Sequence, residues 1–130
     1  MGGALLANEA HVRIEGNLTS SSNGNSTITV YDGGIVEITG DVAYKGKGAN
    51  AVFMDGGELS VKGRVTGADY SAVYVKEGTL RVVGNVVLKT RQSYAVVADK
   101  GEIEITGVID APYPYYIMDS EFGKITVKAP

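Results

Sequence analysis

The stretch GELSVKGRV at residues 57–65 returns in the same frame as GTLRVVGNV at 78–86. Two more copies are GIVEITGDV at 34–42 and GEIEITGVI at 101–109, and weaker copies are AHVRIEGNL at 10–18 and GKITVKA at 123–129. The six copies begin 21 to 24 residues apart. A regular spacing of this length is typical of proteins built from stacked repeats.

Each copy alternates apolar and polar residues between its two glycines. In the copy that begins at residue 57, Leu59 and Val61 are apolar and Ser60 between them is polar. This period of two predicts a half-buried β-strand. An apolar position follows the second glycine, and an apolar run such as AVFM at 51–54 precedes the first. We therefore predict three short strands per repeat, with glycine at the bends.

Stacking explains how such short strands can be buried. A single copy cannot cover its own apolar face, whereas copies stacked about 4.8 Å apart pair each strand in parallel with its equivalent in the next copy. The sequence thus predicts an all-β fold, a single-stranded parallel β-helix (β-solenoid) of about six coils of 22–23 residues. The predicted register sets Arg81 beside Glu104 and Glu102 beside Lys124. We expect residues 1–130 to form one solenoid domain, either whole or part of a longer solenoid.

Composition narrows the classes of function. The chain has 12 basic and 15 acidic residues, a formal net charge of −3 and no cysteine. Such a chain offers no basic field for nucleic acid, and it excludes thiol catalysis and disulfides. No apolar run approaches the length of a membrane span, and the first residues lack the pattern of a signal peptide. We therefore expect no nucleic-acid partner and no membrane span.

The phrases AVFMDGGELSVKGRV at 51–65 and SAVYVKEGTLRVVGNV at 71–86 resemble the coils of right-handed, pectate-lyase-like β-helices. They resemble in particular the repeats of bacterial surface adhesins and autotransporter passengers, and the resemblance covers residues 10–128. It implies an extracellular or cell-surface location. Bactofilins, which are polymerising β-helix proteins, are similar in length and coil number but have shorter coils.

Six of the eight tyrosines lie in or next to the segments that join one coil to the next: Tyr44, Tyr70, Tyr94, Tyr113, Tyr115 and Tyr116. Exposed tyrosine rings stack on sugars and anchor protein partners. The alternative is a ladder of rings that only packs a corner of the solenoid. Our candidate binding residues for glycan or protein are Tyr70, Tyr94, Tyr113, Tyr115 and Tyr116.

The strand before the first glycine is apolar on both faces, although only one face can point inward. Phe53, Tyr74 and Val97 are therefore predicted to form an exposed apolar stripe, which is the usual mark of a partner interface. The alternative is that the segment ALLA at 4–7 covers this stripe. Unpaired strand edges at the two ends of a solenoid offer another route to a homo-oligomer.

Acidic residues recur two positions before the first glycine, at Asp32, Asp55, Asp99 and Glu121. Stacked carboxylates of this kind could hold calcium, since a cation offsets their repulsion. Turn chemistry explains them better, because Asp before Gly hydrogen-bonds its own backbone, and Lys76 in the same column is a counterion. We favour the turn interpretation and keep calcium as the alternative, with no other cofactor expected.

Together these features favour a non-catalytic structural and binding module of a bacterial surface or secreted adhesin-like protein, which contacts glycan or protein. One alternative is a self-assembling scaffold that forms an oligomer or filament. Another is a minimal calcium-dependent polysaccharide lyase or hydrolase. We consider an enzyme the less favoured reading, because the candidate bases Arg64 and Arg81 have no long loops around them to form a cleft.

Overall fold

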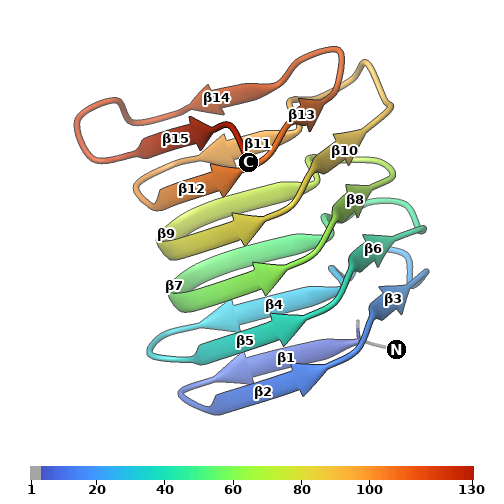
Figure 1. Ribbon diagram of the computed structural model, residues 1–130, viewed down its shortest axis with the longest axis vertical. Coiled ribbons are helices and arrows are strands. Elements are labelled where there is room, and N and C mark those ends of the chain that lie inside the picture. Colours follow the sequence, from blue (N-terminus) through green and yellow to red (C-terminus); the bar gives the residue numbers. More distant parts are fainter. Residues whose placement is uncertain (1–3) are drawn as a thin grey trace.

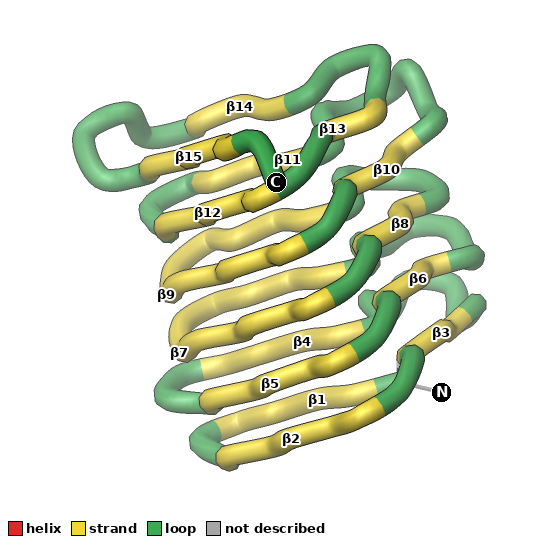
Figure 2. The backbone as a smooth tube through the Cα atoms, viewed as in Figure 1, coloured by secondary structure: helices red, strands yellow, loops and turns green. Residues whose placement is uncertain are grey.

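The computed structural model describes residues 4–130, which wind into a parallel β-solenoid of about 5 turns (Figure 1). The coils climb from β1 and β2 at one end to β14 and β15 at the other, with loops joining them along one side (Figure 2). The described residues contain strands and turns but no helix. The predicted all-β solenoid is confirmed.

A full coil contributes to three parallel faces, which we call the first, second and third sheets; the first two are joined through the bend by two long strands and together form one 10-stranded sheet. The first sheet is made of β1 (Leu5–Asn8), β4 (Ile28–Tyr31), β11 (Val96–Ala98), β14 (Tyr115–Ile117) and the first parts of β7 (Val52–Lys62) and β9 (Val73–Val83). The second sheet is made of β2 (His11–Glu15), β5 (Ile35–Thr39), β12 (Glu102–Thr106), β15 (Lys124–Lys128) and the remainder of β7 and β9. The third sheet is made of β3 (Leu18–Ser20), β6 (Val42–Tyr44), β8 (Val65–Gly67), β10 (Val86–Leu88) and β13 (Ile109–Asp110).

The core is formed by the apolar residues of each strand, which alternate with polar residues and point inward as predicted. In the second sheet, Leu59 is in register with Val36 and Leu80, and Val61 is in register with Ile38 and Val82. All six of these side chains are buried. The equivalents in the outermost coils, such as Val12 and Ile125, are only partly buried because they have a neighbouring coil on one side. Burial of these columns is the main force that holds the coils together.

Glycine is required at the bend between the second and third sheets. Gly84 has a φ of +153°, and a Cβ atom there would collide with the carbonyl oxygen of Gly63 in the preceding coil. The same collision recurs between Gly107 and Gly84. A side chain at this bend would therefore push neighbouring coils apart. The predicted bends are confirmed, and close stacking explains why the residue is glycine.

At three of these bends the residue after the glycine accepts a hydrogen bond from the next coil. The side-chain oxygen of Asn17 accepts a hydrogen bond from the backbone N–H of Asp41 at 2.8 Å, and the carboxylate of Asp41 accepts one from Arg64 N–H at 2.8 Å. Asn85 makes the equivalent bond to Val108 N–H at 3.0 Å. Arg64 interrupts the series, since its side chain is a donor only.

The predicted charge neighbours lie in register, but the ion pair forms elsewhere. Glu104 is opposite Arg81, and Glu102 is opposite Lys124. Within residues 4–130, however, Glu104 forms its ion pair with Lys128 Nζ at 3.6 Å. Both side chains of that pair are substantially exposed, so it contributes little to stability.

Candidate functional site

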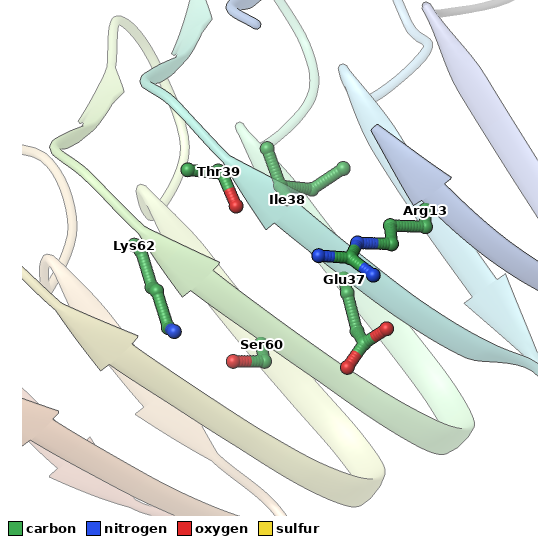
Figure 3. A pocket seen from close by; sticks show the side chains of 6 residues that line it. All are labelled: Arg13, Glu37, Ile38, Thr39, Ser60 and Lys62. Atoms are coloured by element: carbon green, nitrogen blue, oxygen red, sulfur yellow. The ribbon is translucent and has the colours of Figure 1, made fainter. Parts of the chain in front are cut away.

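The outward face of the second sheet carries charges of both signs. A hollow of about 140 Å³ lies over β2, β5 and β7, and its lining includes Arg13, Glu37, Ser60 and Lys62 (Figure 3). Ile38, which follows Glu37 in β5, points to the opposite side, toward the core (Figure 3). Because the charges alternate in sign and the hollow is small and polar, this face resembles an ordinary solvated surface.

The outward face of the first sheet is different, because one of its columns is mostly apolar. Pairing of the strands sets Leu6, Thr29, Phe53, Tyr74, Val97 and Tyr116 in register, one from each coil. The rings of Phe53 and Tyr74 are stacked, with centroids 5.7 Å apart. Parallel in-register pairing therefore converts a repeat in the sequence into a row of rings along the solenoid axis.

Three tyrosines gather at the end of this row. The ring of Tyr94 stacks on that of Tyr116 with centroids 5.0 Å apart, and it meets Tyr113 in a tilted arrangement at 5.8 Å. All three are between 40% and 47% exposed. Arg91 and Gln92 line the hollow beside them. These contacts bring together three of the five predicted binding tyrosines.

A pocket lies beside the stacked rings of Phe53 and Tyr74. Its volume is about 370 Å³, and it is lined by Asn50, Phe53, Tyr70, Ser71, Tyr74, Ser93 and Val97. Tyr70, a fourth predicted binding residue, is 56% exposed at this pocket. We call the six rings of Phe53, Tyr70, Tyr74, Tyr94, Tyr113 and Tyr116 the aromatic face.

Val97 is not part of an exposed stripe, contrary to the prediction. It is only 6% exposed, although its neighbours in register, Tyr74 and Tyr116, are both accessible. The Tyr74 hydroxyl lies 3.2 Å from the sulfur of Met118, which is two coils away along the sequence. The longer side chains on either side thus shelter the short valine. Phe53 and Tyr74 remain half-buried members of the face.

The N-terminal segment does not cover this face, which corrects the alternative prediction. Residues 5–8 form β1, which pairs in parallel with β4 and so extends the first sheet by one strand. Leu6 falls in the outward column and is 66% exposed. The segment alternates inward and outward side chains as the other strands of the first sheet do, and it therefore pairs as the end strand of that sheet.

Tyr44 is a core residue and not a member of the tyrosine ladder. It is 1% exposed, and its hydroxyl lies 2.8 Å from the carbonyl oxygen of Ser22 and 2.7 Å from that of Lys47. Burial raises the pKa of the Tyr44 phenol, because the charged form would lose its hydration. Tyr44 follows Val42 by two residues, so the period of two already indicated that it points inward.

Tyr115 points in a different direction from the other binding candidates. It lies in register with the buried Val96 and is therefore in an inward column, yet it is 56% exposed because β14 has only β11 as a neighbour. Together with Val108 and Val127, it lines a pocket of about 410 Å³ at the end of the solenoid. The structure thus separates Tyr115 from the aromatic face.

The acidic residues proposed for calcium do not form a continuous column. Asp55 is in register with Tyr31 on one side and with Glu77 on the other, because β7 and β9 shift register at this bend. Asp32 has a φ of 52°, a left-handed conformation that Asp tolerates in turns. Among residues 4–130, no three His, Asp or Glu side chains lie close enough together to hold a metal ion.

The polar residues at the bottom of the Tyr70 pocket were not predicted from the sequence. Asn50 and Ser71 are almost fully buried, and Asn50 Nδ2 donates a hydrogen bond to the Ser71 carbonyl oxygen at 2.8 Å. The hydroxyl oxygens of Ser71 and Ser93 are 3.1 Å apart. A signal was present, because Asn50 and Ser71 each stand directly before an Ala-Val pair that starts a strand of the first sheet.

Comparisons with protein families, with characterised proteins and with solved structures give no match to this chain. The class of protein is therefore defined by the fold itself, which is a parallel β-solenoid repeat protein. No helix that could cross a membrane occurs in residues 4–130.

Proposed function

We propose that this chain is a non-catalytic binding module, a repeat segment of a bacterial surface or secreted adhesin-like protein that contacts glycan through the aromatic face. The observation that supports this most strongly is the grouping of partly exposed rings on the first sheet and on the loops that lead into it, where Tyr94 stacks on Tyr116 at 5.0 Å and Phe53 on Tyr74 at 5.7 Å. An extracellular or cell-surface location follows from this function and is part of the proposal.

Physical chemistry favours a sugar as the ligand of this face. Rings that already pack against one another lose little conformational entropy on binding, and a tyrosine combines an apolar face with a hydroxyl group. Asn50, Ser71 and Ser93 line the same pocket as the rings of Phe53, Tyr70 and Tyr74, so that hydrogen-bonding groups and apolar surface occur together there. A sugar ring has the same combination, with C–H groups on its faces and hydroxyls around its edge.

Binding to a printed array of neutral and acidic oligosaccharides tests this function. We expect the wild-type chain to bind a subset of the array, and Tyr116→Ala to weaken that binding by about tenfold or more, which corresponds to the loss of a central contact residue. Phe122→Ala is the matched control, because Phe122 is an even more accessible ring that lies outside the aromatic face, in the turn between β14 and β15. Absence of glycan binding by the wild type, or an equal loss in both variants, would contradict the proposal.

Self-assembly is a second candidate function, favoured by the final coil. Val127 is in register with the buried Ile105 but is 43% exposed, and β15 pairs with β12 alone. Unpaired parallel strands with inward apolar residues are a template for another coil. The occupant proposed is the β1–β2 coil of a second copy, which presents the partly buried Val12 and Ile14.

Light scattering during size-exclusion chromatography tests this second function. If copies stack end to end, the mass of the wild-type chain rises with concentration, and Val127→Lys keeps it at one chain. Thr126→Lys is the control, since Thr126 is on the outward face of the same strand. A wild-type mass of one chain across the whole concentration range would rule out assembly through this end.

A further inference from the structure

We infer that the pocket beside Tyr70 is a subsite for one uncharged hexose ring, a step that rests on the glycan-binding function proposed above. The pocket is lined by Tyr70 and by the stacked rings of Phe53 and Tyr74. Its volume of about 370 Å³ is at the lower end of the range for small-molecule sites. It is therefore of a size for one ring and not for a chain segment of a protein.

Asn50 supplies an acceptor that the fold itself leaves unused. The side chain is held in place by its donor bond from Nδ2 to the Ser71 carbonyl oxygen, and its backbone N–H donates to Ser26 Oγ at 3.2 Å. Among residues 4–130 every fully buried side-chain nitrogen or oxygen has a partner, whereas no hydrogen bond is accepted by Asn50 Oδ1. This oxygen is consequently not fully buried, and Asn50 lines the pocket.

The paired serines supply a donor. The hydroxyls of Ser71 and Ser93 are 3.1 Å apart, and one hydroxyl proton satisfies their mutual bond. The proton of the other hydroxyl remains available. The pocket thus presents one fixed acceptor and one donor beside two stacked rings, which is the arrangement that positions a polyol.

The charges around the pocket indicate that the sugar is neutral. No residue that lines the pocket is ionisable at neutral pH, since its members are aromatic, aliphatic, serine or asparagine. The nearest acid in the sequence, Asp69, uses its carboxylate to accept the Gly48 backbone N–H at 2.6 Å. A uronate carboxylate would therefore lose hydration here without gaining a cation among the residues that line the pocket, which disfavours its binding.

Two monosaccharides that differ in one group test the subsite directly. We would titrate methyl β-D-glucopyranoside and methyl β-D-glucuronide into the full chain and follow amide NMR signals. The expected result is a saturable shift of the Asn50 side-chain amide and of the Tyr70 and Ser71 backbone amides with the glucoside, and at least about tenfold weaker binding of the glucuronide. Equal binding of the two sugars would overturn the assignment of a neutral ligand.

Variants separate failure of the subsite from failure of the function. Tyr70→Ala removes an exposed ring and should abolish the glucoside shifts. Ser93→Ala removes only a hydroxyl and should weaken them. Phe122→Ala should leave the glucoside shifts unchanged. If the oligosaccharide array is bound but the glucoside shifts only Tyr94, Tyr113 and Tyr116, the subsite is wrong and the function stands. If neither the array nor the glucoside is bound, both are wrong.

Discussion

The first and second sheets have the same interior but different exteriors. Both bury columns of valine, isoleucine and leucine, and both are paired in parallel from coil to coil. Outside, the second sheet carries alternating charges such as Arg13 and Glu37, whereas the first carries the rings of Phe53, Tyr74 and Tyr116. Because the second sheet is formed without outward rings, rings are not needed to build such a sheet. The inward columns therefore supply the stability of the solenoid, and the aromatic face is available for binding.

The largest effect is expected from a charge placed on the inward side of a strand, compared with the same charge on its outward side. Val82→Lys would bury an unpaired ammonium in the core, and we expect it to cost several kcal/mol and unfold the neighbouring coils. Thr79→Lys is the matched variant, because position 79 lies opposite Glu58 and Glu102. Thermal melting should show a large loss for the first and almost none for the second. Similar melting temperatures would mean that the inward column is misassigned.

The bend between the second and third sheets gives the next largest effect. Gly84→Ala forces a Cβ against the Gly63 carbonyl oxygen, and we expect a loss of about 2–3 kcal/mol in the free energy of unfolding. Gly16→Ala has a similar positive φ but meets no atom within 4 Å, so that it isolates the cost of the backbone conformation. Urea unfolding should rank the two variants in this order, and the reverse order would contradict the close stacking of coils.

Tyr44 is buried, in contrast to the tyrosines of the aromatic face, so its hydroxyl should contribute to stability. Tyr44→Phe removes the hydroxyl bonded to the Ser22 and Lys47 carbonyl oxygens, at an expected cost of about 1–3 kcal/mol. Burial raises the pKa of Tyr44 above the 10.0 of an ordinary tyrosine, so above pH 10 the unfolded chain ionises first and stability falls.

Unfolding measured from pH 8 to 11 tests the expected loss of stability at alkaline pH. We expect the alkaline loss of stability to be smaller in Tyr44→Phe than in the wild type, because the variant has no buried phenol to titrate. Tyr94→Phe is the control, since Tyr94 is exposed. An alkaline loss that is the same in all three proteins would contradict the burial of Tyr44.

The smallest expected effect is a gain in stability at the bend between the second and third sheets. Arg64 is the one position from Asn17 to Asn85 in this corner series that cannot accept a hydrogen bond from the next coil. Arg64→Asn should complete the series with the Asn85 backbone N–H and stabilise the chain by about 0.5–1 kcal/mol. Arg64→Ala, which removes the charge without adding an acceptor, is the control. Equal stability of the two variants would mean that the corner bonds are without net value.

The sequence predicted those parts of the fold that depend on local pattern. Two glycines and a period of two determine the strands, the bends and the buried columns around Leu59 and Val61, and stacking then determines the register. The shift at Asp55 was not predictable, because β7 and β9 take different paths through the bend although the spacing between paired residues there changes by only one residue. A pattern of residue types does not encode such a local bulge.

The candidate site was predicted less completely, because it depends on side-chain reach. The sequence placed four rings near one edge of the coil, and all four belong to the aromatic face: Tyr70, Tyr94, Tyr113 and Tyr116. The burial of Val97 depends on which way the Tyr74 ring leans. The Asn50 pocket depends on how loops of unequal length return to the first sheet. Neither can be deduced without the packing of neighbouring coils.

The most direct test measures binding and stability on the same samples of a Tyr94→Ala, Tyr116→Ala double variant. Our account predicts that array binding is lost while the melting temperature stays within a few degrees of the wild type, since stacked exposed rings contribute only about 1 kcal/mol to folding. Binding that survives in the double variant would contradict the aromatic face as the binding surface. A collapse of the melting temperature would show instead that these rings hold the solenoid together.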